Sequence, residues 1–211
     1  MSNEGALHDF IRAIVPGDIV LIKYSSNAPV EKIAWGEIIP SIHDHGIVSI
    51  DFWGGIGDIL MRKFAKTSGV EYTKILDVIR EIKIIKIGPG AASYGEVLED
   101  IVPTYEPQNF LRNYHSILSR ISRLPRKPKY AVVFGLSHYI YFNPEKALKS
   151  ILTAVGTIPA GDLAIISFVN TSILNEAHIG ILEELSTKVA EVSGGGRLSW
   201  PEEREYDISR R

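Results

Sequence analysis

The chain has 211 residues, 45% of them hydrophobic and 23% charged, which is the balance of a globular protein large enough for one well-buried core. Its net charge of −2 gives no general attraction to nucleic acid or to an anionic membrane, and the absence of cysteine excludes disulfides, thiolate catalysis and cysteine-bound metals. No apolar run approaches the roughly 18 residues that span a bilayer, and the opening MSNEGALHDF lacks the basic and apolar regions of a secretory signal, so a cytoplasmic protein is expected.

Helices are predicted to alternate with buried strands along residues 1–87. Ser2 or Asn3 can cap a first helix, which the Pro16-Gly17 turn ends. The runs that follow are short and nearly all apolar, as in strands buried on both faces of a sheet. The predicted order is a helix to residue 14, a strand over 18–24, a helix over 29–41, a strand over 47–52, helices over 58–67 and 71–79, and a strand over 82–87.

The rest of the chain begins with an irregular segment, GPGAASYGEVLEDIVPTYEPQ, which is predicted to be a long loop because glycine and proline interrupt it. After it the alternation resumes, and the chain ends in two short strands joined across three consecutive glycines, the pattern of a hairpin. The predicted order is a helix over 108–122, a strand over 130–136, a helix over 144–155, a strand over 163–169, a helix over 176–186, and strands over 188–192 and 197–200.

Apolar strands that alternate with helices predict an α/β fold with a mostly parallel central sheet covered on both sides, in three layers. The C-terminal hairpin would extend this sheet. No internal repeat, linker or low-complexity tract interrupts the chain, so residues 1–211 are predicted to form a single domain.

The first strand–loop–helix, VLIKYSSNAPVEKIAW, occupies the place where nucleotide-binding proteins of this architecture hold phosphate. A working phosphate loop follows G-x-x-x-x-G-K-[ST], in which glycines let backbone N–H groups wrap the phosphates and lysine neutralises them. In this chain Pro29 removes one N–H donor, and Lys32 lies a turn into the helix. The loop contains no glycine and offers instead Tyr24, Ser25, Ser26 and Asn27.

Five segments over nearly the whole chain carry a resemblance: PGDIVLIKYSSNAPVEKIAWGEI, GIVSIDFWGGIGDIL, IKIIKIG, YAVVFGLSHYI and STKVAEVSGG. In this order they resemble a family of uncharacterised archaeal proteins from hyperthermophiles of the Pyrococcus and Thermococcus type, a domain of unknown function. The isoleucine-rich composition, with two methionines and no cysteine, fits a thermophilic source. That family is in turn similar to the RecA/KaiC-type ATPases, so the resemblance implies a RecA-like core without an established activity.

The resemblance also implies a degenerate nucleotide site. Asp51 stands where these ATPases end their second strand with a catalytic glutamate, and Gly135 stands where an acidic residue linked to magnesium would follow AVVF. With the phosphate loop and this acidic residue missing, we expect no ATP hydrolysis, no catalytic residue and no bound cofactor, although ATP or ADP binding remains an alternative. The residues that would contact a nucleotide are Tyr24, Ser25, Ser26, Asn27, Lys32 and Asp51.

Three other patterns in the sequence bear on ligands and partners. His43 and His45 are two residues apart and do not share a helix face, so no metal site is expected. The basic stretch 120–129 would attract phosphate-rich partners but lacks interleaved aromatic residues, which makes nucleic acid an unlikely ligand. The aromatic residues Tyr139, Tyr141, Phe142, Trp35 and Trp53 are expected to lie mostly in the core, and any of them that were exposed together would mark a partner or peptide groove.

The sequence therefore predicts a non-catalytic RecA-like module that binds or regulates, not an enzyme. The sequence is compatible with a homo-oligomer and with a protein or peptide partner and does not decide between them. No membrane association is expected. The alternative is a nucleotide-binding ATPase or switch with a non-standard phosphate loop. A second alternative is a nucleic-acid-binding accessory protein that uses the basic stretch.

Overall fold

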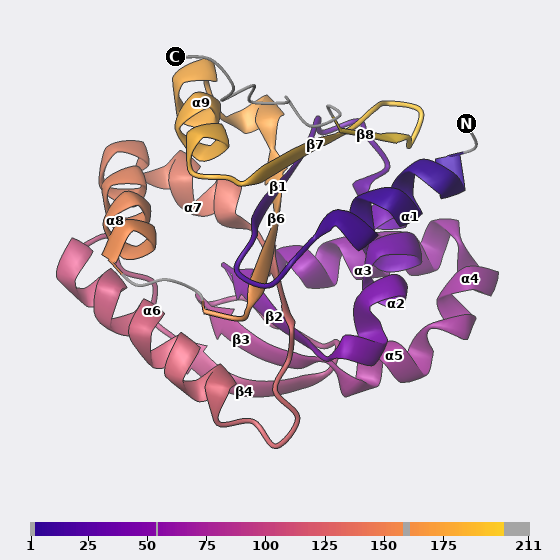
Figure 1. The fold of residues 1–211 in the computed structure, drawn as a ribbon, viewed down its shortest axis with the longest axis horizontal. Coiled ribbons are helices and arrows are strands. Elements are labelled where there is room, and N and C mark those ends of the chain that lie inside the picture. The colour runs from indigo at the N-terminus through magenta and orange to yellow at the C-terminus, as the bar shows by residue number, and fades with distance from the viewer. Residues whose placement is uncertain (1–2, 54, 158–160, 201–211) are drawn as a thin grey trace, which may run out of the picture.

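A computed structural model describes residues 3–53, 55–157 and 161–200. Its centre is an eight-stranded sheet in the order β4-β3-β2-β5-β6-β1-β7-β8, in which β7 and β8 are antiparallel and the other neighbouring strands are parallel. Figure 1 shows helices α1 to α5 on one side of this sheet and α6 to α9 on the other. The predicted three-layer fold with a mostly parallel sheet and a C-terminal hairpin is confirmed.

The strands are short and, apart from β4, β7 and β8 near the two edges of the sheet, mostly buried. They are β1 (Ile19–Tyr24), β2 (Ile47–Phe52), β3 (Lys83–Ile87), β4 (Glu96–Ile101), β5 (Tyr130–Phe134), β6 (Ala164–Asn170), β7 (Lys188–Val192) and β8 (Leu198–Ser199). All six residues of β2 are buried, as expected for a parallel strand covered on both faces.

Two hydrophobic clusters fill the spaces between the sheet and its two helical layers. The first joins the sheet to α1 (Asn3–Ala13), the π-helical segment η1 (Lys32–Ile38), α2 (Ile39–Ile42), α3 (Ile56–Thr67), α4 (Gly69–Lys74) and α5 (Leu76–Glu81). The second joins it to α6 (Pro107–Ser122), α7 (Leu136–Phe142), α8 (Pro144–Thr157) and α9 (Glu176–Glu184). Two short 3-10 helices, η2 (His43–His45) and η3 (Thr171–Ile173), lie in the connections.

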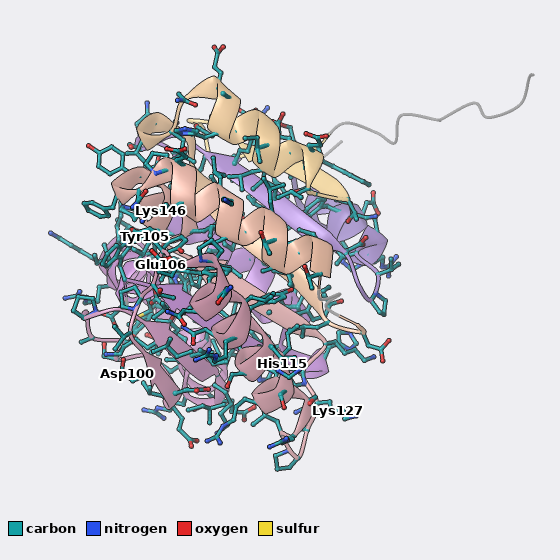
Figure 2. All side chains as sticks on the ribbon, turned by 90° about the vertical axis from the view of Figure 1, so that its left-hand side faces the viewer. Asp100, Tyr105, Glu106, His115, Lys127 and Lys146 are labelled. Carbon is teal, nitrogen blue, oxygen red and sulfur yellow. The ribbon has the colours of Figure 1, made fainter. Side chains whose placement is uncertain are left out.

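Helices α6 and α8 form most of the second layer, and Figure 2 looks onto this face. Glu106, just before α6, and Lys146, on α8, are neighbours there, and their Oε1 and Nζ atoms form an ion pair of 3.3 Å. Tyr105 stacks on Tyr139 of α7 with ring centroids 4.7 Å apart and donates a hydrogen bond to its carbonyl oxygen. The start of α6 is therefore tied to both α7 and α8.

Most predicted elements are present within one or two residues, but the single helix predicted over 71–79 is two short helices, α4 and α5, separated at Ile75. Two elements were missed. Strand β4 lies inside the segment predicted to be a loop, because its sequence EVLEDI is acidic and exposed at the sheet edge and lacks the apolar pattern of the central strands. Helix α7 has only seven residues and begins directly after β5, so the strand predicted over 130–136 ends at Phe134.

Two further details differ from the predicted elements. The helix predicted over 29–41 is π-helical over η1, and Pro40 lacks the N–H that an α-helix would use to reach the carbonyl of Gly36. The predicted capping residue Ser2 lies outside the described residues. Within the part of the chain that the structure describes, no helix is both long and apolar enough to span a bilayer.

Candidate functional site

The loop after β1, where a phosphate would bind, is closed by its own hydrogen bonds. Ser25 Oγ donates to Asn27 Oδ1 at 2.6 Å, and the N–H of Ala28 donates to the carbonyl oxygen of Ser25 at 2.9 Å. The N–H of Val30 donates to the carbonyl oxygen of Ala28 at 2.8 Å. Two backbone donors of the loop, the N–H groups of Ala28 and Val30, are thus occupied within the loop and do not face an anion.

The same loop is also bound to the turn after β6. The N–H of Ser26 donates to Ser172 Oγ at 3.0 Å, and Asn170 Nδ2 donates to Ser26 Oγ at 3.1 Å. Thr171 Oγ1 donates to the carbonyl oxygen of Tyr24 at 3.2 Å. This turn was not predicted from the sequence, although the polar run NTS at the end of a buried strand was a usable indication.

The two flanking candidates have different surroundings. Tyr24 is buried at the end of β1, and this burial raises the pKa of its hydroxyl to about 12. Lys32 is exposed at the start of η1, and its N–H donates to the carbonyl oxygen of Pro29. Its neighbour Glu31 is only 2% exposed and forms an ion pair of 3.1 Å with Lys63 of α3.

Asp51 is fully buried and is bound to the first turn of α3. Its Oδ1 accepts the N–H of Ile56 at 3.1 Å, and its Oδ2 accepts the N–H of Gly57 at 3.1 Å. Tyr94 donates its hydroxyl to Asp51 Oδ2 at 3.1 Å, which leaves Ser49 Oγ, 2.8 Å from the same hydroxyl, to donate to Tyr94. Asp51, on β2, therefore caps the N-terminus of α3. A negative charge is favourable there because it accepts the unpaired N–H groups of the first helical turn.

Burial dominates the electrostatics of this network. It raises the pKa of Asp51, while the N–H donors of α3 and the Tyr94 hydroxyl act in the opposite direction. Burial and the adjacent Asp51 raise the pKa of Tyr94 well above its usual value. Tyr94 was missed by the sequence analysis because it lies in the segment predicted to be a loop.

The structure brings Ser25, Ser26 and Asn27 together in one loop, but Asp51 lies apart from them. Strands β5 and β6 separate β2 from β1, which at the usual strand spacing is about 14 Å. Binding of a nucleotide by the six predicted residues stays a prediction.

Gly135 follows β5 in a left-handed conformation with φ of 75°. A Cβ atom at this position would lie 2.3 Å from the carbonyl oxygen of Phe52, which is closer than real contacts allow. Gly135 is also the residue before α7, so the chain must turn there to begin the helix. The backbone itself therefore disfavours any side chain at this position, including an acidic one.

An aromatic cluster is formed by Trp53, which follows the carboxyl end of β2, and by Tyr141 and Phe142 at the end of α7. Phe142 is 63% exposed and Tyr141 is 57% exposed, and Trp53 packs edge-on against Phe142 with ring centroids 5.1 Å apart. Trp53 has φ of 63°, the only positive value among the described non-glycine residues, and its indole N–H is buried without an acceptor among them. Trp53 thus combines a strained backbone with an unpaired hydrogen-bond donor, and backbone strain of this kind is found most often at binding and active sites.

Two of the other candidate residues, His43 and Arg126 of the basic stretch, line a further pocket of about 360 Å³. His43 Nε2 lies 3.0 Å from Glu81 Oε2, and no group of three or more histidine, aspartate or glutamate residues in this part of the chain could hold a metal ion. In the basic stretch 120–129, Arg126 donates to the backbone carbonyl oxygen of Asp44.

Comparisons with solved structures show the fold that the chain shares. A protein of Pyrococcus horikoshii superposes with a TM-score of 0.75 at 18% identity, over 96% of this chain and 94% of that one. A KaiC-like protein of the same organism superposes with a TM-score of 0.56 at 16% identity, over 90% and 81% of the two chains. An uncharacterized P. horikoshii protein, solved in complex with an unknown peptide, gives a TM-score of 0.56 at 13% identity, over 92% and 89%.

These likenesses confirm the predicted RecA/KaiC-like three-layer fold. A comparison with curated proteins finds no match. The sequence pattern of the family described as "Pyrococcus protein of unknown function, DUF257" matches residues 9–197. The chain therefore belongs to this family of uncharacterised Pyrococcus proteins, as the sequence predicted.

Proposed function

We propose that this protein is a non-catalytic RecA/KaiC-like module whose ancestral nucleotide site is closed and whose function is to bind or regulate a partner. The observation that carries the proposal is the loop after β1, where Ser172 occupies the N–H of Ser26 and Asn27 occupies the hydroxyl of Ser25. A phosphate would have to displace these bonds, and no glycine is present to let the backbone rearrange around it. Asp51 supports the same proposal because both of its oxygens already accept hydrogen bonds.

We expect no saturable binding of ATP or ADP, with or without magnesium, when the purified protein is titrated by calorimetry up to millimolar nucleotide. The unfolding midpoint in denaturant should be equally unchanged, although a ligand at 100 times its dissociation constant would add about 2.7 kcal/mol to the free energy of unfolding. Saturable binding that Lys32→Ala abolishes and Lys66→Ala preserves would overturn the proposal and favour the nucleotide switch. Lys66 is a suitable control because it is an exposed lysine on α3, away from the loop.

The aromatic cluster favours a more specific function, the binding of an extended segment of a protein partner. Exposed aromatic side chains are the residues that most often anchor protein interfaces. Trp53 is held in place from behind, because Gly90 donates its N–H to the Trp53 carbonyl oxygen at 3.1 Å and a Cβ on Gly88 would lie 2.7 Å from Trp53 Cα. The bound peptide in the structurally similar P. horikoshii protein is consistent with such a partner.

Peptides selected from a random display library against the immobilised protein should bind through this cluster. We expect the double change Tyr141→Ser and Phe142→Ser to weaken their binding about tenfold or more, since truncating interface aromatics commonly removes 2 kcal/mol or more. The control is Val70→Ser, which removes a similarly exposed apolar side chain from α4, and it should have no effect. Failure to select any peptide, or equal binding by the double variant, would contradict this function.

A further inference from the structure

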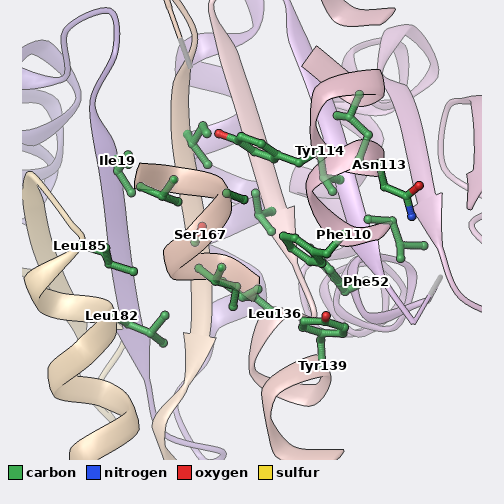
Figure 3. A pocket seen from close by; sticks show the side chains of 18 of the residues that line it. Ile19, Phe52, Phe110, Asn113, Tyr114, Leu136, Tyr139, Ser167, Leu182 and Leu185 are labelled. Atoms are coloured by element: carbon green, nitrogen blue, oxygen red, sulfur yellow. The ribbon is translucent and has the colours of Figure 1, made fainter. Parts of the chain in front are cut away.

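A cavity of about 120 Å³ lies between the sheet and the helical layer of α6 to α9. Figure 3 shows Ile19 and Leu185 on one side of it and Phe110 and Asn113 of α6 on the other, with Ser167 of β6 between them. Its wall is almost entirely aliphatic and aromatic, and none of its lining residues is charged. This space is separate from the loop after β1 and from the aromatic cluster.

The cavity exists because small residues occupy two positions in its wall. Ser167 lies in the middle of β6, where its neighbours across the sheet are Leu21 of β1 and Val133 of β5. Ala154, on the overlying α8, is 1% exposed and also lines the cavity. Protein interiors are normally packed about as densely as organic crystals, and larger aliphatic residues at either position would fill this space.

Ser167 is the unusual member of this wall. It is 8% exposed, and its hydroxyl has no hydrogen-bond partner among the described residues. It is also the one polar residue that the described strands contribute to the cavity. Of the other polar residues in the wall, Thr104, Tyr139 and Ser186 already use their hydroxyls in hydrogen bonds. Asn113 and Tyr114 belong to α6, which faces the sheet across the cavity. The Ser167 hydroxyl is therefore the polar group that the sheet side offers to a ligand.

We propose that this cavity binds a small, uncharged, mostly apolar molecule that carries one hydrogen-bonding group, of the alcohol or phenol class, with that group paired to Ser167. The absence of charged residues in the wall excludes a carboxylate or an ammonium group inside the cavity. Its size is close to that of an engineered cavity of about 150 Å³ that holds benzene, so the buried part of the ligand has roughly six to eight heavy atoms. The polar group sets the orientation of the ligand, and the apolar wall supplies the affinity.

Phenol and toluene test the proposal because they have nearly the same shape and differ in one hydroxyl. Binding is measured on the full chain by ligand-observed NMR and by the shift of the thermal unfolding midpoint. We expect phenol to bind about five- to tenfold more tightly than toluene, as one net hydrogen bond requires. Ser167→Ala should remove this preference and keep the binding of toluene.

Ala154→Leu should fill the cavity, abolish the binding of both probes and raise the unfolding midpoint of the unliganded protein. Lys149→Leu is the matched control, because it adds a leucine to the exposed face of the same helix. If Ala154→Leu does not fold, Ser167→Val fills the cavity from the sheet side and gives the same readout. Equal signals from the wild type and the filled variant would show a packing gap only, and equal affinity for the two probes would overturn the role of Ser167.

Discussion

Replacing Asp51, at the carboxyl end of β2, by alanine is expected to lower the free energy of unfolding by about 3 to 5 kcal/mol. The change leaves the N–H groups of Ile56 and Gly57 and the hydroxyl of Tyr94 without their acceptor. Each such group costs about 1 to 3 kcal/mol when it is buried and unpaired. Urea unfolding followed by circular dichroism measures the loss.

Two further variants separate the network from a general effect of charge. Tyr94→Phe removes one hydroxyl and should cost about 1 to 2 kcal/mol, because Asp51 and Ser49 each lose one partner. Asp100→Asn removes a carboxylate that is 63% exposed and paired with Lys86, and it should change stability by less than about 1 kcal/mol. If Asp51→Ala costs no more than Asp100→Asn, Asp51 is not the cap of α3.

The pH dependence of stability gives an independent measure of Asp51. Its folded pKa is raised above the ordinary 3.8, so the folded state holds the proton more tightly than the unfolded state does. The resulting contribution favours folding below pH 3.8 and is lost as the pH rises through the folded pKa. Asp51→Asn removes the titrating group, so the stability difference between wild type and variant should change across this interval and be constant outside it.

The fold could be predicted from the sequence because its central strands are short apolar runs, which are distinct from the helices around them. Strand β4 could not be predicted in this way, because it lies at the exposed edge of the sheet and is acidic instead of apolar. Its acidic residues form ion pairs with lysines of β3, such as Lys86–Asp100. Helix α7 was missed for another reason: Gly135 ends β5 without any polar break, so strand and helix share one apolar run.

The candidate site was harder to predict because its contacts join distant parts of the chain. The pattern around Tyr24 to Lys32 indicated which groups of a phosphate loop are missing, but not that Ser172 binds the N–H of Ser26. Asp51 was predicted from its place at the end of a strand, while its partner Tyr94 lies 43 residues further on, in a segment without periodicity. The strain at Trp53 is a property of the backbone and has no counterpart in composition.

Gly135→Asp, which places a carboxylate where the RecA-like pattern has its acidic residue, is expected to destabilise the protein by about 2 to 5 kcal/mol without creating a magnesium site. A non-glycine residue with φ near 75° costs about 1 to 2 kcal/mol, and relieving the 2.3 Å approach of Cβ to the Phe52 carbonyl oxygen adds about 1 to 3 kcal/mol. Urea unfolding with and without magnesium measures both effects.

The controls distinguish the backbone from the side chain at this position. Gly135→Ala should cost a similar amount, because the obstacle is Cβ and not the carboxylate, whereas Gly156→Ala in α8 has no atom within 4 Å of its Cβ and should stabilise the helix by about 0.5 to 1 kcal/mol. A Gly135→Asp protein that folds as well as the wild type and gains magnesium-dependent ATP binding would show that a single side chain separates this chain from an active site. The expected result places the difference in the backbone, in the strand–helix turn that begins α7, the helix that carries Tyr141 and Phe142 of the aromatic cluster, and that leaves no room for a metal ligand.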